Sequence, residues 1–118
     1  MPLKLDEVSA DDFFLRRKED WFLNFGMENC EACKQHADAW ANVHSDDVRL
    51  AEINCMSYAS RDLCRYFGLT GVPVIIRVSQ GNYFYMPVTL EKTADNLQLF
   101  MESAFEDAFI QGALPNNE

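Results

Sequence analysis

The fold of this 118-residue chain is decided by the stretch WFLNFGMENCEAC, residues 21–33. Trp21–Phe25 is a short, mostly apolar run rich in aromatic residues, which is typical of a strand buried on both faces. Residues 30–43 carry apolar side chains at helical spacing, so we predict a helix that begins at the first of two cysteines. The stretch therefore predicts a strand-to-helix junction with a Cys-x-x-Cys pair at the start of the helix.

The motif Cys30-Glu31-Ala32-Cys33 suits thiol–disulfide chemistry at this place. A thiol at a helix N-terminus faces unpaired backbone N–H groups and the positive end of the helix dipole, which favour its thiolate. A second thiol three residues later lies one turn away, within bridging distance. The first cysteine can then attack a disulfide, and the second can resolve the mixed disulfide that forms.

Outward from this junction, the chain alternates strands and helices. A helix is capped by Ser9 and runs to about Lys18, after a weakly indicated strand near residues 3–8. The later elements are a strand at 48–53, a helix at 60–67 ended by Gly68, a strand at 74–78, a turn at 80–82, a strand at 83–86 and a helix capped by Thr93. This order predicts an α/β fold, a three-layer sandwich in which helices flank a mixed β-sheet on both faces. We expect one domain over residues 1–111 and a polar C-terminal tail over residues 112–118.

Composition narrows the function classes. The chain is 48% hydrophobic and 25% charged, as in soluble globular domains, and its formal net charge is −9. Ten Lys plus Arg against nineteen acids disfavour nucleic acid as a partner, because a phosphate backbone requires a basic surface. An anionic membrane surface is disfavoured for the same reason. The longest apolar runs are far shorter than the roughly 20 residues of a membrane-spanning helix.

Three segments together resemble the thioredoxin fold. They are Trp21–Phe25, Cys30-Glu31-Ala32-Cys33-Lys34 and Tyr66-Phe67-Gly68-Leu69-Thr70-Gly71-Val72-Pro73. The chain is most similar to the catalytic (a-type) domains of the protein disulfide isomerase family, over about residues 5–105. The resemblance implies that Pro73 follows a cis peptide bond beside the active-site pair, and that the backbone of Val72 pairs with a substrate strand.

The other two cysteines, Cys55 and Cys64, follow the third predicted strand and lie in the next helix. Several isomerase-family domains carry a structural disulfide here, so the resemblance implies a Cys55–Cys64 bond. Such a bond favours an oxidising compartment. Two buried free thiols in a cytosolic protein are the alternative.

Three positions depart from the family pattern. Asn24 stands where the family has a buried acid, and an amide cannot take a proton from the resolving thiol. Asn29 replaces a tryptophan before Cys30, and Asp38 replaces a helix proline, which puts the expected kink in doubt. Glu28 and Glu31 add negative charge beside Cys30, so we expect a less oxidising pair.

Other interpretations of these residues remain open at this stage. All four cysteines could ligate one zinc ion, although the eight residues between Cys55 and Cys64 do not suit zinc-finger spacing. The Cys30–Cys33 pair could be a plain stabilising disulfide. His36 is interpreted as a solvent-facing helical histidine, and Trp21 as only partly buried.

The sequence thus predicts a thiol–disulfide oxidoreductase of the protein disulfide reductase or isomerase type. Cys30 attacks cysteines of client proteins and Cys33 resolves, with no metal or organic cofactor required. A peptide- or protein-binding module with weak redox activity is the alternative. Residues 1–6 show no signal region. Since a Cys55–Cys64 disulfide favours an oxidising compartment, we expect a domain of the endoplasmic reticulum lumen or secretory pathway that lacks its signal peptide, with the cytoplasm as the alternative. We also expect the domain to be monomeric.

Overall fold

A single mixed sheet runs through the centre of the computed structural model, which describes residues 4–5, 9–104 and 112–115. Its six strands are arranged in the order β1-β3-β2-β4-β5-β6. They are β1 (Lys4–Leu5), β2 (Trp21–Gly26), β3 (Arg49–Asn54), β4 (Val74–Ser79), β5 (Asn82–Tyr85) and β6 (Gly112–Ala113). Of the strand expected near residues 3–8, only Lys4 and Leu5 are among the described residues.

Strand directions divide the sheet into two parts. Strands β1 and β2 pair in parallel with β3, whereas β4 pairs antiparallel with β2. The remaining pairs, β4 with β5 and β5 with β6, are antiparallel. Parallel neighbours require a crossover connection, and the helix-containing segment between β2 and β3 provides it. The predicted mixed sheet is confirmed.

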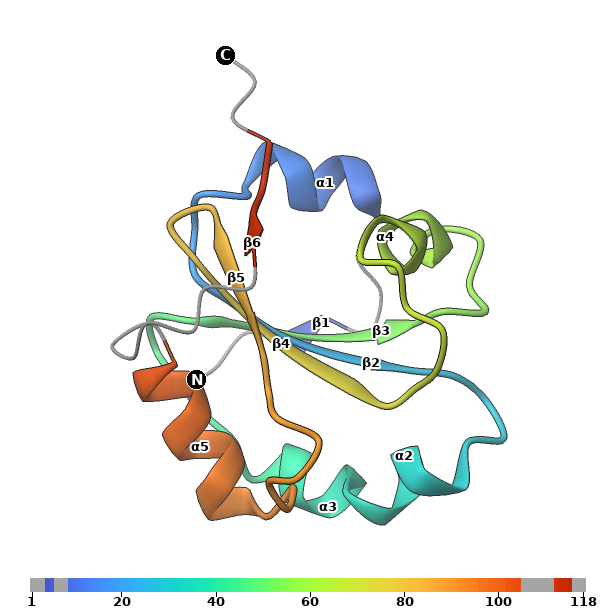
Figure 1. Ribbon diagram of the computed structural model, residues 1–118, viewed down its shortest axis with the longest axis vertical. Helices are drawn as coiled ribbons and strands as arrows, with labels where there is room; N and C mark the ends of the chain where they lie inside the picture. The colour runs from blue at the N-terminus through green and yellow to red at the C-terminus, as the bar shows by residue number, and fades with distance from the viewer. Residues whose placement is uncertain (1–3, 6–8, 105–111, 116–118) are drawn as a thin grey trace.

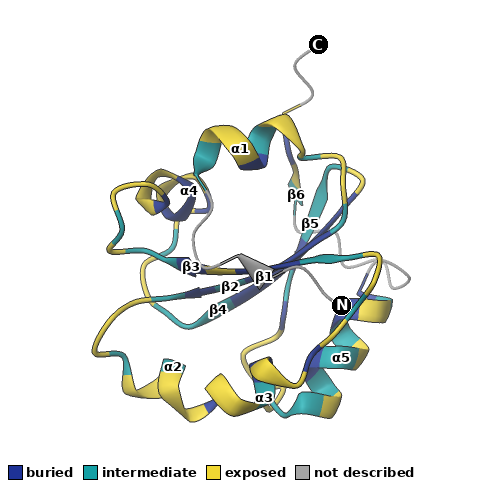
Figure 2. Ribbon diagram, turned by 180° about the vertical axis from the view of Figure 1, so that it is seen from behind, coloured by how far each residue is buried: buried dark blue, intermediate teal, exposed yellow. Residues whose placement is uncertain are grey.

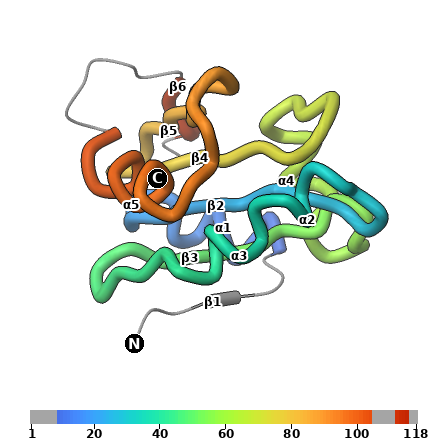
Figure 3. The backbone as a smooth tube through the Cα atoms, turned by 90° about the horizontal axis from the view of Figure 1, so that it is seen from below, coloured from blue at the N-terminus to red at the C-terminus, as the bar shows by residue number. Residues whose placement is uncertain are grey.

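Helices cover both faces of the sheet (Figure 1). They are α1 (Ala10–Leu15), α2 (Glu31–Gln35), α3 (Ala37–Ala41), α4 (Arg61–Tyr66) and α5 (Ala94–Ser103). Helices α1 and α4 lie on one face, and α2, α3 and α5 lie on the other. Seen from below in Figure 3, α3 and α5 lie beside each other. The predicted three-layer α/β sandwich is confirmed.

Strand β2 supplies both hydrophobic cores, because its side chains point alternately to the two faces. Trp21, Leu23 and Phe25 join the core beneath α1 and α4. Phe22 joins the core beneath α3 and α5, where its ring lies 5.0 Å from that of Trp40. Figure 2 shows the buried strands between helices whose outer sides are exposed. The strand is therefore buried on both faces, as the aromatic-rich run predicts.

The helix expected over residues 30–43 is interrupted. Helix α2 ends at Gln35 and α3 begins at Ala37, with His36 between them at φ −112° and ψ 13°. Asp38 therefore does not remove the kink, which lies two residues before it in the chain. Asp38 lies in the first turn of α3, where the helix dipole favours an acid.

Caps and turns follow the sequence signals closely. The Ser9 hydroxyl accepts the N–H of Asp12, and the Thr93 hydroxyl accepts the N–H of Asn96, both at 3.1 Å. Gly68 has a φ of +64°, a conformation that glycine adopts without steric cost just past the end of α4. Helix α1 is shorter than expected and ends at Leu15 rather than near Lys18.

The C-terminal boundary needs a correction. Gly112 and Ala113, predicted as the start of a polar tail, pair with Tyr83 and Asn82 of β5. Leu114 is buried and packs in the core beneath α1. These residues belong to the sheet because they continue its antiparallel edge, a long-range pairing that no local pattern reveals.

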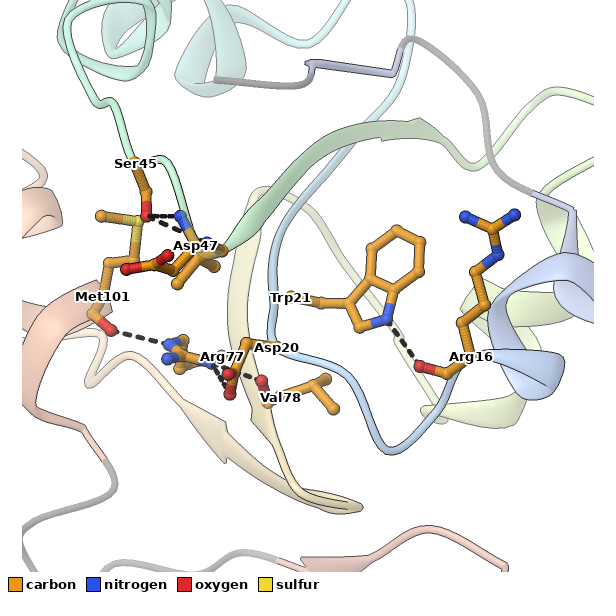
Figure 4. Close-up of polar contacts among 9 residues, drawn as sticks. Arg16, Asp20, Trp21, Ser45, Asp47, Arg77, Val78 and Met101 are labelled. Atoms are coloured by element: carbon orange, nitrogen blue, oxygen red, sulfur yellow. Dashed lines mark hydrogen bonds and ion pairs between the residues drawn. The ribbon is translucent and has the colours of Figure 1, made fainter. Parts of the chain in front are cut away.

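Two polar anchors brace the end of the sheet opposite the cysteine pair (Figure 4). The guanidinium of Arg77, on β4, donates to the backbone oxygen of Met101 on α5 at 2.7 Å and pairs with Asp20 at 3.1 Å. The indole N–H of Trp21 donates to the Arg16 carbonyl at 3.1 Å. Trp21 is buried, so the expectation of partial burial is wrong. These contacts tie α5 and the segment after α1 to the sheet.

Candidate functional site

A disulfide joins Cys30 and Cys33 where the chain enters α2, with the two Cα atoms 5.2 Å apart. Cys30 is the N-cap residue, and its sulfur accepts the N–H of Cys33 at 3.1 Å. Both cysteines are half-buried, and α2 has no buried residue. When the bond is reduced, the same N–H stabilises negative charge on the Cys30 sulfur. The geometry makes Cys30 the cysteine better suited to carry a thiolate.

Two residues that precede Cys30 in the chain, Asn29 and Gly26, allow the two cysteines to lie this close to each other. Asn29 has a φ of +60°, in the left-handed region that asparagine tolerates better than most residues. Gly26, at the end of β2, lies directly under the second cysteine, since a Cβ there would stand 3.3 Å from the Cys33 sulfur. Asn29 thus turns the chain into α2 and Gly26 makes room for the sulfur. Sequence reasoning noted neither role.

A pocket of about 300 Å³, which we call the Cys33 pocket, opens beside the second cysteine. Its walls come from the ends of β2 and β3, the loop after β2, and α2 and α3. They include Asn24, Gly26, Glu28, Cys33, Glu52 and Asn54. The half-buried Asn24 lines this pocket together with Cys33, so the structure brings this predicted residue to the cysteine pair. Glu52 was not identified from the sequence, where it is one of nineteen acids in the chain.

The Val72–Pro73 peptide is cis, as the resemblance implies. Pro73 and Ala32 line one pocket of about 380 Å³ with His36, Val88, Leu90 and other residues. The helix that begins at the cysteine pair and the loop before β4 therefore face a common hollow. Val72 is half-buried and packs against the core beneath α4.

His36 does not face solvent, so its sequence interpretation is wrong. Its side chain is 6% exposed, and its Nε2 atom is buried without a hydrogen-bond partner among the described residues. Burial, with the nearby positive charge of Lys92, lowers the pKa of His36 below its ordinary value of 6.5. The break between α2 and α3 turns the ring inward, and the helical pattern alone gives no sign of that break.

The second pair of cysteines forms the other disulfide, which links Cys55 after β3 to Cys64 in α4 with Cα atoms 5.9 Å apart. Cys64 belongs to the core beneath α4, and Cys55 packs against it. Within the closed loop, the Ser60 hydroxyl donates to the Asn54 carbonyl at 3.1 Å. The bond therefore fastens α4 to the end of β3, with Cys64 buried and Cys55 half-buried.

The four cysteines lie in two separate disulfides, whereas the zinc alternative requires them around one point. Over residues 4–5, 9–104 and 112–115, no cluster of three or more His, Cys, Asp or Glu residues is placed to hold a metal ion. Within the same ranges, no helix has the length and apolar character needed to cross a membrane.

The charges around Cys30 are solvent-exposed. The carboxylate of Glu31 lies 3.7 Å from the Lys34 ammonium, and the Glu31 side chain is 83% exposed. Glu28 is also exposed. Solvent and the Lys34 partner screen the Glu31 charge, so its repulsion of a Cys30 thiolate is small.

Comparison with solved structures identifies the fold. The J-Trx1 fragment of ERdj5 superposes with a TM-score of 0.70 at 21% identity, over 87% of this chain and 52% of that fragment. The first two thioredoxin domains of Saccharomyces cerevisiae Eps1p give 0.70 at 19% identity, over 86% of this chain and 41% of that one. Thioredoxin f from spinach chloroplast gives 0.63 at 19% identity, over 86% and 94%.

These likenesses show that the chain has a thioredoxin-like fold, resembling domains found in both thioredoxins and larger proteins. The chain spans about half the length of the ERdj5 fragment. No protein-family profile matches the sequence, and no curated protein matches it.

Proposed function

We propose that this chain is a thiol–disulfide oxidoreductase, of the protein disulfide reductase or isomerase type, that acts on cysteines of client proteins. The observation that carries the proposal is the Cys30–Cys33 pair at the N-terminus of α2, half-exposed and beside the Pro73 loop. The structures similar to this chain include thioredoxin domains of Eps1p and thioredoxin f.

The two cysteines have different roles in the proposed reaction. Cys30 attacks a client disulfide as the thiolate, forming a mixed disulfide and releasing one client thiolate. Cys33 then attacks the Cys30 sulfur, which forms the Cys30–Cys33 bond and releases the second client sulfur. The client is reduced by two electrons and the pair is oxidised by two. In isomerisation a second client thiolate instead attacks the client sulfur of the mixed disulfide, which forms a new client disulfide and releases Cys30 as a thiolate, with no net change in oxidation state.

Val72 and Pro73 are the proposed client-binding residues. A client segment that added its backbone to the chain at Val72 would lie beside the pocket shared by Ala32 and Pro73. Backbone pairing of this kind accepts many sequences, because it reads the main chain and not the side chains. It suits an enzyme that acts on diverse clients.

The direction of electron flow follows from the charges. Glu28 and Glu31 disfavour the Cys30 thiolate and so destabilise the reduced form, which makes the pair less oxidising. This agrees in sign with the sequence-based expectation of a less oxidising pair, which stays a prediction. Because the Glu31 carboxylate is exposed and paired with Lys34, the effect on the potential is small. We propose that the pair serves reduction or isomerisation, with Glu28 and Glu31 as minor influences.

A binding module with weak redox activity is the second candidate. Asn24 favours it, because this side chain lines the Cys33 pocket and offers no group that accepts a proton. Asn29 and Asp38 also depart from the family pattern. In that case the chain would capture client proteins at Val72 and Pro73 without exchanging disulfides.

The Cys55–Cys64 disulfide supports a place in an oxidising compartment. We propose the endoplasmic reticulum lumen or secretory pathway, with the cytoplasm as the alternative. The proposed working unit is a monomeric domain, now taken to include Gly112–Leu114, with client proteins as partners and no part for nucleic acid or membrane contact.

Trapping of the mixed disulfide tests the proposal. In Cys33→Ala the resolving thiol is absent, so Cys30 should accumulate covalent adducts with a disulfide-bonded reporter such as insulin. Cys30→Ala/Cys33→Ala is the matched control and should form none. Adducts that disappear with a reducing agent, together with dithiol-dependent insulin reduction by the unaltered chain, support the enzyme. Absence of both leaves the binding module.

A further inference from the structure

The resolving thiol needs a proton acceptor if it is to attack quickly. A free cysteine has an ordinary pKa of about 8.5, so at neutral pH most of a thiol population is protonated and a poor nucleophile. The Cys33 sulfur lies over the backbone of Gly26, and the Cys33 pocket opens beside it. Groups that line this pocket are the ones placed to take the proton.

Among these groups, Asn24 is not a base, because its amide does not accept a proton near neutral pH. The ionisable carboxyl groups that line the pocket are Glu28 and Glu52. Glu28 lies in the loop between β2 and α2, whereas Glu52 lies within β3 and is paired with Asn24 of β2. Glu52 is thus the carboxylate held by the more rigid element.

The sheet register places Glu52 on the correct face. Glu52 is the cross-strand partner of Asn24 in the parallel β2–β3 pair. Phe22 and Leu50, each two residues earlier on its strand, both lie in the core beneath α3 and α5. Because side chains alternate along a strand, Asn24 and Glu52 point to this same face, the face that carries α2 and Cys33.

The distances allow transfer through water. Gly26 lies two residues along β2 from Asn24, and β3 lies one strand spacing away, so the Glu52 and Gly26 Cα atoms are about 8 Å apart. Glu52 and Cys33 both line the Cys33 pocket. The pocket, of about 300 Å³, has room for water molecules that could relay a proton, and Glu52 is exposed, so the proton can pass on to solvent.

We propose that Glu52 accepts the proton of the Cys33 thiol, through water in the Cys33 pocket, when the mixed disulfide is resolved. As the proton leaves, the Cys33 sulfur bonds to the Cys30 sulfur. The bond between Cys30 and the client sulfur breaks, and its electron pair goes to the client sulfur, which takes a proton from solvent. The inference rests on the proposed function, and it moves the base from the β2 position, where Asn24 stands, to the adjacent strand.

Single-turnover kinetics of Glu52→Gln test this assignment. The chain is first reduced with dithiothreitol, the reagent is removed, and decay of the mixed disulfide with a peptide disulfide is followed from pH 6 to 9. We expect Glu52→Gln to resolve the adduct roughly 10- to 100-fold more slowly near pH 7. The difference in rate between the variant and the unaltered chain should close as the pH approaches the ordinary pKa of a thiol, since Cys33 then ionises without a base. A purely structural effect would slow resolution equally at every pH.

Three further variants complete the test. Asn24→Asp in the Glu52→Gln background should restore much of the rate by placing a carboxylate on the neighbouring strand. Glu102→Gln, an exposed substitution on α5, should change nothing. An unchanged rate in Glu52→Gln, or the same slowing in Glu28→Gln instead, overturns the assignment. Failure of Cys33→Ala to form any adduct would overturn the proposed function itself, so the two failures are distinguishable.

Discussion

The two disulfides of this chain are the same covalent bond in opposite surroundings. Cys30–Cys33 caps a helix that has no buried residue, and both of its cysteines are half-buried beside two pockets. Cys55–Cys64 joins β3 to α4, and Cys64 belongs to the hydrophobic core. Both cysteines of the first bond are half-buried, whereas the second bond joins a half-buried cysteine, Cys55, to a buried one, Cys64.

The difference shows that accessibility separates a reactive disulfide from a structural one. Each bond closes a short loop, of three and nine residues in sequence separation. Attack by an external thiolate requires a path to one sulfur, and the first bond offers two half-buried cysteines beside a pocket, whereas Cys64 of the second bond is buried in the core. We therefore expect substitutions at the first pair to change chemistry and substitutions at the second pair to change stability.

The largest effect is expected from Cys30→Ser. A hydroxyl is a far weaker nucleophile than a thiolate, so insulin reduction should fall by at least about 10³-fold. Far-UV circular dichroism should match that of the unaltered chain, because α2 buries nothing that the substitution removes. Residual activity above this level would place the attacking thiol elsewhere and break the contrast between the two pairs.

Removal of the second bond in Cys55→Ser/Cys64→Ser should lower the free energy of unfolding by about 2–3 kcal/mol, the chain-entropy value for a loop of about ten residues. Denaturant titration measures this change. Insulin reduction at a temperature where the variant is folded should stay within about 2-fold of the unaltered rate. A loss of activity without a loss of stability would show that this disulfide takes part in the chemistry.

His36 makes the region of the first disulfide sensitive to pH. Burial and the charge of Lys92 hold its pKa in the folded chain below the ordinary value of 6.5. The folded state therefore binds a proton less readily than the unfolded state, and stability is lost as the pH falls below about 6.5. His36→Gln should show less of this loss between pH 7.5 and 5 in urea titrations.

The matched control for this prediction is the second histidine of the chain. His44 is exposed, so His44→Gln should leave the pH dependence of stability as it is in the unaltered chain. Equal behaviour of the two variants would mean that burial of His36 does not govern the acid response.

The smallest effect is expected from the exposed charges that accompany each disulfide. Glu31 and Lys34 of α2 form an i,i+3 ion pair, and Asp62 and Arg65 of α4 form another. Glu31→Gln removes a negative charge beside the Cys30 thiolate and should make the Cys30–Cys33 pair more oxidising by about 5–20 mV, the equivalent of about 0.2–1 kcal/mol. Asp62→Asn should not move this potential. Equilibration with glutathione redox buffers measures both, and a shift in the opposite direction would contradict the charge argument.

Much of the fold was predictable because its signals are local. The aromatic run of β2, the Ser9 and Thr93 caps and the Gly68 helix end each act within a few residues, so the sequence reports them directly. Strand β6 was missed for the opposite reason. Gly112–Ala113 is a strand only because it meets β5, about 30 residues earlier in the chain.

The candidate site divides in the same way. The Cys30–Cys33 pair follows from its spacing and its position at a strand-to-helix junction. The Cys33 pocket does not, because Glu52 reaches it through the register of β2 against β3. Alternation of apolar residues along β3 could have assigned Glu52 a face, but not the neighbour on that face.

The sequence by itself determined the order of elements, the two cysteine pairs and the place of the first pair at a helix start, since spacing and local conformational preference encode all three. Only the tertiary structure decided that His36 is buried, that Gly112–Leu114 complete the sheet and that Glu52 lies beside Cys33. Burial and proximity between distant segments arise from packing, and packing depends on the whole chain.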